Sequence, residues 1–400
     1  MTESGAKQAA TEIASRLHEA GHIAWFAGGC VRDELLEIKP KDYDIATDAL
    51  PDVVQALFPR AIPVGAAFGV MLVRHLGATV EVATFREEGG YSDHRRPDSV
   101  RFSDAQHDAQ RRDFTINGLF QDPATGEVHD FVQGQRDLNE HTIRAIGCAD
   151  DRLNEDHLRM LRAVRFATRL TYKIEPDTEA AIKRHAPHLQ GVSPDRIGDE
   201  IRGILRCEAG PRGAIMLEEY GLAAVMFGST AESPECPRLS KSKCLSLPSQ
   251  FAAWALDRGG SSMEPNATVQ AWRTALSLSN KERDDMRSCM QAVERFRQWD
   301  SLGIAQRKRL AQEDWNTPCV AILSAEDQTI ADRIHHELED LAATPIAPPR
   351  LLTGDQLVAD GMDAGPDFGR VLEAVYDAQL EGILTTSEAA IALARQLAGR

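Results

Sequence analysis

Paired cysteines, long apolar runs and an excess of positive charge are all missing from this sequence. No Cys-x-x-Cys pair occurs among its seven cysteines, which argues against a zinc site and against a secreted disulfide framework. No stretch approaches the ~20 apolar residues that cross a bilayer. The first residues also lack a basic region followed by an apolar core. We therefore expect a cytoplasmic protein with no membrane segment.

The charge balance is acidic. The 400 residues include 45 Lys and Arg against 61 Asp and Glu, a formal net charge of -16, which repels a polyanion at long range. If the protein binds RNA, a local basic surface must do it. Hydrophobic residues make up 42% and charged residues 26%, a composition typical of a globular chain, and the length predicts two to four folded units.

A glycine turn stands near the start of the chain. An apolar run, residues 23–27, meets Gly28 and Gly29, and a helix-like segment that carries Arg32 follows. Backbone N–H groups and a guanidinium are thereby offered at the start of a helix, where a phosphate is stabilised. The turn predicts a phosphate-binding element.

Two aspartates follow the glycine turn. Asp42 and Asp44 are two residues apart, and in an extended chain this spacing places both carboxylates on one face of a strand. Two such charges about 4 Å apart repel by roughly 4 kcal/mol at an effective dielectric constant of about 20, which favours a divalent cation between them. A phosphate-binding turn beside a cation site indicates nucleotidyl or phosphoryl transfer.

Glu81 is the candidate for a third carboxylate. It interrupts an apolar strand, residues 79–85, where a charge is costly unless it is paired or bound to a metal. The alternative is an edge-strand glutamate that points to solvent. Residues 86–101, which show no periodicity and contain Gly89 and Gly90, fit either a mobile loop over a site or a solvated surface loop.

A row of arginines marks a predicted helix over residues 155–170. Arg159, Arg162, Arg165 and Arg169 recur at spacings of three and four, so they share one face. No acidic residue follows Asp156 in the sequence until residue 175. The row therefore favours an anion-binding face, and the alternative is a solvated face.

Five motifs in order resemble those of the class II tRNA nucleotidyltransferases, the CCA-adding enzymes, and of their close bacterial poly(A) polymerase relatives. They occupy residues 28–33, 42–44, 111–117, 155–159 and 193–200, and residues 351–382 resemble the C-terminal part of the same enzymes. Asp195 departs from the family, which more often has Glu at that position. No His-Asp metal-hydrolase pattern occurs in the C-terminal half, so we expect no attached phosphohydrolase domain.

The resemblance implies an α+β fold, with an N-terminal polymerase-β-like nucleotidyltransferase sheet domain followed by an all-helical neck, body and tail. It places a catalytic head at residues 1–148 and a neck for nucleotide-base recognition at 149–208. A helical body at 209–345 and a tRNA-binding tail at 346–400 would follow.

The resemblance also implies roles for individual residues. Asp42 and Asp44 would hold Mg²⁺, with Glu81 as a third catalytic carboxylate. On the neck, Asp156 and Arg159 would hydrogen-bond the base of CTP or ATP. The full set of nucleotide-binding residues implied is Gly28, Gly29, Arg32, Arg112, Asp156, Arg159, Arg162 and Arg165. The implied partners are the 3′ end of tRNA, ATP and CTP.

Narrower specificities remain open. The protein could add only the terminal A, or it could be a poly(A) polymerase, although residues 61–75 lack the Gly-Arg-Arg-Phe signature associated with the latter. The full-length segment 86–101 disfavours an enzyme that adds only C. A silent RNA-binding homologue is the alternative of another class, and retention of the metal and base-reading residues argues against it.

Overall fold

The computed structural model describes residues 4–65, 68–94, 97–260, 263–343, 345–361 and 366–399. The chain divides into two compact units. Met1–Thr230 with Thr274–Ser277 form the first unit, and Ala231–Arg273 with Leu278–Arg400 form the second. The finer division into head, neck, body and tail stays a prediction.

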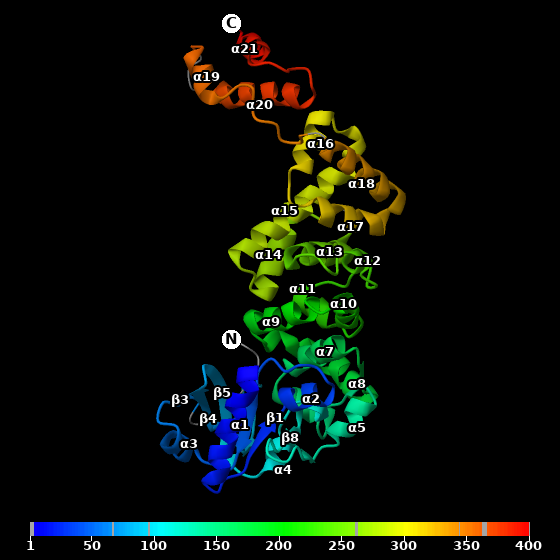
Figure 1. Cartoon of the computed structure of the whole chain (residues 1–400). Coiled ribbons are helices and arrows are strands. Elements are labelled where there is room, and N and C mark those ends of the chain that lie inside the picture. The colour runs from blue at the N-terminus through cyan, green and yellow to red at the C-terminus, as the bar shows by residue number, and fades with distance from the viewer. Residues whose placement is uncertain are drawn as a thin grey trace. The chain divides into compact units, whose positions relative to one another are not determined.

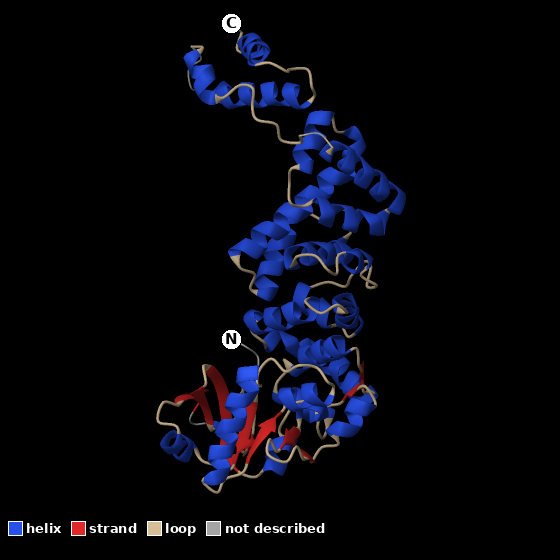
Figure 2. Cartoon of the chain, viewed as in Figure 1, coloured by secondary structure: helices blue, strands red, loops and turns tan. Residues whose placement is uncertain are grey.

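A mixed sheet is the centre of the first unit (Figure 2). Its strands are β1 (Ala24–Ala27), β2 (Asp44–Thr47), β3 (Ile62–Gly65), β4 (Val70–His75), β5 (Ala78–Thr84), β8 (Leu119–Gln121) and β9 (Val128–Asp130). They are ordered β3-β4-β5-β2-β1-β8-β9. The central pair β2 and β5 runs parallel, and the other neighbouring pairs run antiparallel. The parallel pair brings the start of β2 beside the middle of β5.

Helices before and between the strands complete the head. They are α1 (Ser4–Glu19), α2 (Gly29–Leu35), α3 (Pro51–Leu57), α4 (Ala105–Gln110), the 3-10 turn η2 (Thr115–Asn117) and α5 (Gly134–Asn139). α1 packs against β5 and β1 through a stripe that includes Ile13 and Leu17, both fully buried (Figure 1). Along β5, Val80 and Val82 are buried whereas Glu81 between them is exposed, so Glu81 lies on the opposite face of the strand.

The segment expected to be a loop over residues 86–101 contains two strands. β6 (Arg86–Gly89) and β7 (Ser99–Phe102) form an antiparallel ribbon in which Arg86 pairs with Phe102. Polar side chains stand on both faces of the ribbon, with Glu87 ion-paired to Arg101. An apolar–polar alternation is therefore absent, which explains why periodicity did not reveal these strands.

The rest of the first unit is largely helical. Its elements are α6 (Ala149–Glu155), α7 (Arg159–Leu170), α8 (Pro176–His185), the 3-10 segment η3 (Ala186–Gly191), α9 (Pro194–Leu205), α10 (Gly210–Glu219) and α11 (Leu222–Phe227). Two short parallel strands, β10 (Thr142–Ile143) and β11 (Lys173–Ile174), join it to the head. Residues 274–277 also belong here, and a Cβ added at Gly198 of α9 would lie 2.1 Å from the carbonyl oxygen of Leu276. Only glycine therefore permits this close approach.

The single helix predicted over residues 155–170 is wrong at its start. α6 ends at Glu155 and α7 begins at Arg159, and Asp156 between them is extended, with φ −145° and ψ 106°. Its Oδ1 accepts the Leu158 N–H at 3.0 Å. A short acidic side chain that bonds to a nearby backbone N–H competes with the helix, which explains the break.

The second unit is helical in its described residues. Its helices are α12 (Pro237–Lys241), α13 (Leu247–Gly259), α14 (Pro265–Leu276, whose last three residues belong to the first unit), α15 (Asn280–Arg297), η4 (Trp299–Ser301), α16 (Ile304–Ala311), α17 (Asn316–Glu326), α18 (Gln328–Ala342), α19 (Gly354–Ala359), α20 (Pro366–Leu380) and α21 (Ser387–Leu397). Trp254 and Trp272 are buried with ring centroids 5.3 Å apart, as expected for core helices. No helix in the described part of the chain has the length and apolarity to cross a membrane.

Candidate active site

A cleft of about 540 Å³ lies in the first unit, between the sheet and helices α7 and α9. Asp42, alone among the predicted site residues, does not line it. The predicted residues that do are Gly28, Gly29, Arg32, Asp44, Glu81, Arg112, Asp156, Arg159, Arg162 and Arg165. The structure therefore gathers residues from the β1–α2 turn, two strands and the α6–α7 junction around one space.

An acidic edge forms one wall of this cleft. Asp44 begins β2 and lies directly in register with Glu81 on the parallel strand β5, so the two side chains emerge from the same face of the sheet. The Asp44 residue is exposed, yet the cleft walls partly desolvate its carboxylate, and the nearby charge of Glu81 adds to this. Together they raise the pKa of Asp44 to about 6, with Arg112 opposing the shift and Asp42 reinforcing it. Both other acids therefore act on Asp44, although Asp42 precedes the strand.

The donor chemistry of this edge fits a hard divalent cation. Carboxylate oxygens are the ligands that Mg²⁺ takes from proteins, and the charge of Glu81, which adds to desolvation in raising the pKa of Asp44, is a repulsion that a cation would relieve. In the described residues, however, no three His, Cys, Asp or Glu side chains are already arranged as a group that could hold a metal ion. The Asp44–Glu81 pair is the preformed part of the edge.

The glycine turn approaches the cleft from the other side of β2. Gly28 has φ 70° and ψ −120°, and a Cβ there would meet the Arg112 Nη1 at 2.8 Å, so both backbone and space require glycine. The Arg112 guanidinium donates a hydrogen bond to the carbonyl oxygen of Asn117 (3.1 Å) and forms an ion pair with Asp108 (3.0 Å). The turn is thus packed against a fixed cation.

Arg32 is more deeply placed than the sequence indicated. Only 2% exposed, it donates from Nε (2.8 Å) and Nη2 (2.6 Å) to Asp33 and from Nη1 (2.6 Å) to the Asn117 side chain. Burial lowers its pKa, which these partners oppose. Its guanidinium lines the cleft, and several of its N–H groups are already hydrogen-bonded to Asp33 and Asn117.

The row of arginines on α7 is neutralised by acids from other parts of the chain, rather than standing unpaired as its own helix suggested. Three of the partners lie on the head or on α9, and the fourth ends α6. The pairs are Arg159–Glu155, Arg162–Asp113 (2.7 Å), Arg165–Glu200 (2.6 Å) and Arg169–Asp33 (2.7 Å). Long-range pairing explains how four cations share one face. The first three arginines still line the cleft.

Asp113, one of these acids, is fully engaged by its neighbours. Burial alone would raise its pKa, but the Arg162 ion pair and a hydrogen bond from the Asn117 side chain (3.0 Å) lower it to about 2. Asn117 in turn accepts from Arg32. A continuous polar chain therefore links α7 to α2 beneath the cleft.

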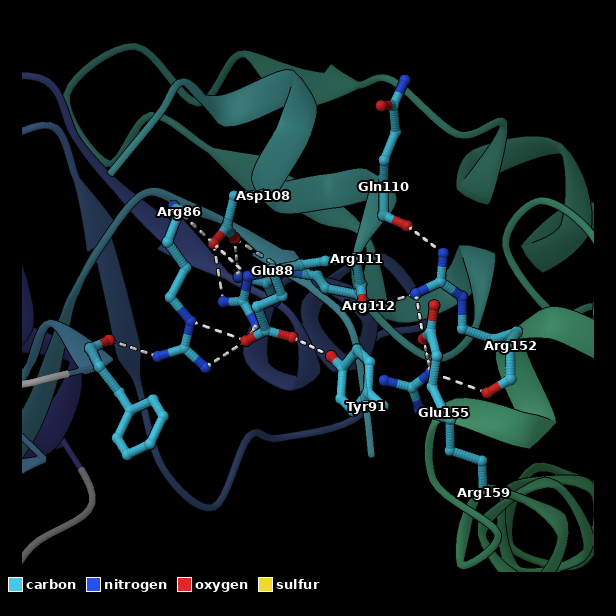
Figure 3. A network of polar contacts seen from close by, with 11 residues as sticks. Arg86, Glu88, Tyr91, Asp108, Gln110, Arg111, Arg112, Arg152, Glu155 and Arg159 are labelled. Carbon is cyan, nitrogen blue, oxygen red and sulfur yellow. Dashed lines mark hydrogen bonds and ion pairs between the residues drawn. The ribbon is translucent and has the colours of Figure 1, made fainter. Parts of the chain in front are cut away.

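A second network fixes the wall formed by β6 and α4 (Figure 3). Glu88 accepts from Arg86 (2.8 Å), Arg111 (3.1 Å) and the Tyr91 hydroxyl. Burial would raise the pKa of Glu88, but Arg111, Tyr91 and Arg86 together lower it. Arg152 joins the network from α6, donating to the Gln110 carbonyl oxygen (2.7 Å) and pairing with Glu155 (2.7 Å), which also binds Arg159.

Sequence reasoning missed several residues of the cleft. They are Arg86, Arg111, Asp113, Asn117, Phe166 and Arg196. Residues 111–117 form one of the five motifs, but the sequence assigned no role to Arg111, Asp113 or Asn117. Arg196 lay within the 193–200 motif and Arg86 at the start of segment 86–101, but neither was given a role, because their partners depend on the fold.

Two family models match the chain. One, described as the poly A polymerase head domain, matches residues 24–144. The other, described as "Probable RNA and SrmB-binding site of polymerase A", matches residues 171–233. The first match spans the glycine turn and all three acids of the acidic edge.

Named relatives match nearly the whole chain. The CCA-adding enzyme of Geobacillus thermodenitrificans is 34% identical over 386 residues, 94% of this chain and 93% of its own. The crystal structure of the Bacillus stearothermophilus CCA-adding enzyme in complex with CTP is 30% identical, covers 98% of both chains and has a TM-score of 0.79. The Thermotoga maritima CCA-adding enzyme complexed with tRNA covers 97% of this chain and 94% of its own, with 19% identity and a TM-score of 0.74, a likeness of fold.

Proposed function

The chain belongs to the family of class II CCA-adding enzymes and bacterial poly(A) polymerases, and we propose that it adds C, C and A from CTP and ATP to the 3′ end of tRNA. The observation that carries the proposal is the composition of one cleft. It joins the Asp44–Glu81 pair to Asp156 and Arg159, so an acidic edge for metal-assisted transfer faces a pair that can read a base.

The acidic edge provides the reaction centre. Asp42 and Asp44 would hold Mg²⁺, with Glu81 beside them as the third carboxylate. Bound Mg²⁺ supplies Lewis acidity, which lowers the pKa of an RNA 3′-hydroxyl and stabilises a pyrophosphate leaving group in an in-line displacement at the α-phosphorus. The strand register contributes by fixing Asp44 and Glu81 relative to each other before substrate binds.

Fixed cations hold the triphosphate. The glycine turn offers backbone N–H groups of Gly28 and Gly29, and Arg32 and Arg112 line the same wall. Because these arginines are already anchored by acids, little conformational freedom remains to be lost when a phosphate binds. Arg162 and Arg165 support the nucleotide from α7.

Asp156 and Arg159 read the base. A carboxylate acceptor next to a guanidinium donor suits the exocyclic amine and adjacent acceptor that C and A share, and it is mismatched to the reversed pattern of U and G. A site built to hydrogen-bond one pattern rejects the other because buried polar groups would be left unpaired. Two bases can thus be selected without a nucleic-acid template.

The 3′ end of tRNA is the acceptor, and we place the reaction in the cytoplasm, where tRNA, CTP and ATP occur. The neck is locally basic, with ten Lys and Arg against six Asp and Glu between residues 159 and 206. This segment supports RNA binding despite the acidic total. The C-terminal residues 346–400 would contact the rest of the tRNA.

Labelled nucleotides distinguish the alternatives. Purified protein with Mg²⁺ is offered tRNA transcripts that end at the discriminator base, after C, or after CC, with each nucleotide in turn. We expect C, C and A to be added in order. Growth only on the CC-ended transcript would indicate an A-adding enzyme, and long A tails on unrelated RNA a poly(A) polymerase. RNA binding with no incorporation would indicate a silent homologue.

A further inference from the structure

We propose that Arg196 is a positioning residue that determines nucleotide specificity, because its hydrogen bond to Asp156 fixes the direction in which that carboxylate accepts from a base. The inference rests on the proposed function of the cleft, in which Asp156 reads the base. It adds a third member, contributed by α9, to the two residues at the α6–α7 junction.

Both oxygens of Asp156 are held by the protein. Oδ1 accepts the Leu158 N–H at 3.0 Å, and Oδ2 accepts from Arg196 Nη2 at 2.7 Å. The side chain of Asp156 is 16% exposed and that of Arg196 is 24% exposed, so the pair lies at the cleft wall with limited access to water. Each carboxylate oxygen can accept more than one hydrogen bond, so an incoming base still finds an oriented acceptor.

Among the described residues, the ion pair of Arg196 is with Asp156. It lies in the first turn of α9, and Glu200, one turn further on, is ion-paired to Arg165. Arg159, the other base-reading residue, is held by Glu155. Each base-reading side chain thus has its own separate anchor.

The pairing matters because the direction of the Asp156 carboxylate decides which base edge it fits. A carboxylate accepts hydrogen bonds, and the exocyclic amine of C and A donates them, whereas U and G present a carbonyl oxygen at the same place. The Arg196 guanidinium, 2.7 Å from Oδ2, fixes the direction of the carboxylate. Without this contact the carboxylate can turn away from the base, so discrimination between the two pairs of bases should weaken.

The test compares Arg196→Met and Arg196→Lys with wild type. Arg184→Met is the matched control, because Arg184 pairs with Asp150 at the same 2.7 Å but on α8, outside the cleft. The readout is the ratio of kcat/KM for CTP over UTP on tRNA lacking CCA, and for ATP over GTP on CC-ended tRNA. Thermal melting verifies that each variant is folded.

We expect Arg196→Met to lower both ratios by roughly tenfold or more. Arg196→Lys should retain most of the selectivity, and Arg184→Met should match wild type. Unchanged ratios in folded Arg196→Met would overturn the proposal. So would an equal loss in Arg184→Met, which would indicate a general effect of charge.

A double variant shows whether Arg196 acts through Asp156. In an Asp156→Asn background, where the acid is already neutral, adding Arg196→Met should cause no further loss of selectivity. A further loss would mean that Arg196 contacts nucleotide or RNA directly, and would overturn the positioning role. Wild-type protein that adds neither C nor A would instead reject the proposed function, and this inference with it.

Discussion

At the scale of single residues, the carboxylate of Asp44 lies where its negative charge is electrostatically unfavourable. Loss of water and the charge of Glu81 raise its pKa to about 6. A functional side chain commonly lowers the stability of the fold that carries it. Asp44 should therefore be a residue whose replacement harms activity and not stability.

We expect Asp44→Asn to reduce nucleotide incorporation by at least about 10³-fold, because several kcal/mol of metal-assisted stabilisation would be lost. Its midpoint of thermal unfolding should equal or exceed that of wild type, since the repulsion with Glu81 is relieved. tRNA binding, measured by filter retention, should be nearly unchanged. Asp52→Asn, an exposed acid on α3, is the control. Comparable activity of both variants would reject the metal assignment.

Single-residue placement was predictable in part where the signal is local. The charge of Glu81 within an apolar strand is visible in the sequence, and the structure sets Asp44 in register with Glu81. The i, i+2 spacing predicted Asp42 and Asp44 on one strand face, but β2 begins at Asp44, so Asp42 lies outside it. Arg196 lay within the 193–200 motif, but its pairing could not be predicted, because its acid lies 40 residues earlier in the chain. Pairing over such separations is created by the fold.

At the scale of elements, Glu88 holds the start of the β6–β7 ribbon against α4. Its side chain is 6% exposed and receives two arginines and a tyrosine hydroxyl. We expect Glu88→Gln to lower the free energy of unfolding by about 3 kcal/mol, because two arginines would lose their buried counter-charge. Tyr91→Phe should cost less, since it removes a single hydrogen bond.

The control is Glu87→Gln, at the residue that precedes Glu88 on β6. Glu87 pairs with Arg101, whose side chain is 81% exposed, and such surface pairs contribute only about 0–1 kcal/mol. Guanidinium chloride unfolding of the full-length protein measures all three variants. Equal losses for Glu88→Gln and Glu87→Gln would contradict the importance of the buried network.

The histidines packed around His157, which lies between α6 and α7, should make the stability of the fold depend on pH. His157 is 6% exposed, with its ring 4.6 Å from that of His94 and 5.0 Å from that of His188. Its Nε2 has no hydrogen-bond partner in the part of the chain that the structure describes. Burial, followed by the charges of His94, His188 and His185, lowers the pKa of His157 to about 4, and Asp156 opposes this.

The unfolded chain should bind this proton more readily, because an unperturbed histidine has a pKa of about 6.5. The contribution of neutral His157 to stability is therefore full above about pH 6.5 and falls as the pH drops toward 4. His157→Phe keeps an aromatic ring and should flatten the dependence measured by urea unfolding at pH 7.5, 6 and 5. An unaltered slope would contradict the assignment. His336→Phe, at an exposed histidine, is the control.

Elements were predicted well where periodicity is strong and poorly where side chains bond to nearby backbone. The apolar face of α7 is buried as its sequence indicated, including Leu161, Val164 and Phe166. The break at Asp156 was missed because a capping carboxylate and a helical residue look alike in a periodic pattern. The break separates Asp156 from Arg159, so the two residues that we propose to read the base lie on either side of a junction rather than on one helix.

At the scale of the whole molecule, the distribution of charge decides how RNA is attracted. Residues 346–400 contain four Lys and Arg against eight Asp and Glu. The described arginines of this segment pair with acids: Arg350 with Glu373, Arg370 with Asp367 and Arg395 with Asp360. The segment therefore offers few cations to a phosphate backbone. The arginines on α7 are paired as well, so we expect exposed cations of residues 149–208, such as Lys173 and Arg206, to supply ionic attraction for RNA.

The salt dependence of tRNA binding tests this division. Lys173 and Arg206 of the neck are exposed, so Lys173→Gln with Arg206→Gln should reduce the slope of log K against log salt by about one per cation removed. Arg370→Gln with Arg395→Gln should leave the slope unchanged, since both are already neutralised. Fluorescence titration between low and high salt measures it. The reverse order would place the ionic contacts in the C-terminal segment.

The overall fold followed from motif order rather than from composition. The head sheet and the largely helical remainder agree with the resemblance, and both are confirmed by relatives that match nearly the full length. The boundary between the two compact units was not foreseeable, because residues 231–273 belong to the second unit and residues 274–277 belong again to the first. Local sequence patterns do not predict such a long-range contact.

The close contact at Gly198 has a practical consequence for making a catalytic fragment. A chain cut after residue 230 would lose residues 274–277, leaving the α9 backbone around Gly198 open to water at the place where the Leu276 carbonyl oxygen now packs. A short linker that replaces residues 231–273 and rejoins this strip would restore the cover. Cleavage of the chain within residues 231–273 should likewise leave the first unit folded, with residues 274–277 still packed on it although they then belong to a separate fragment.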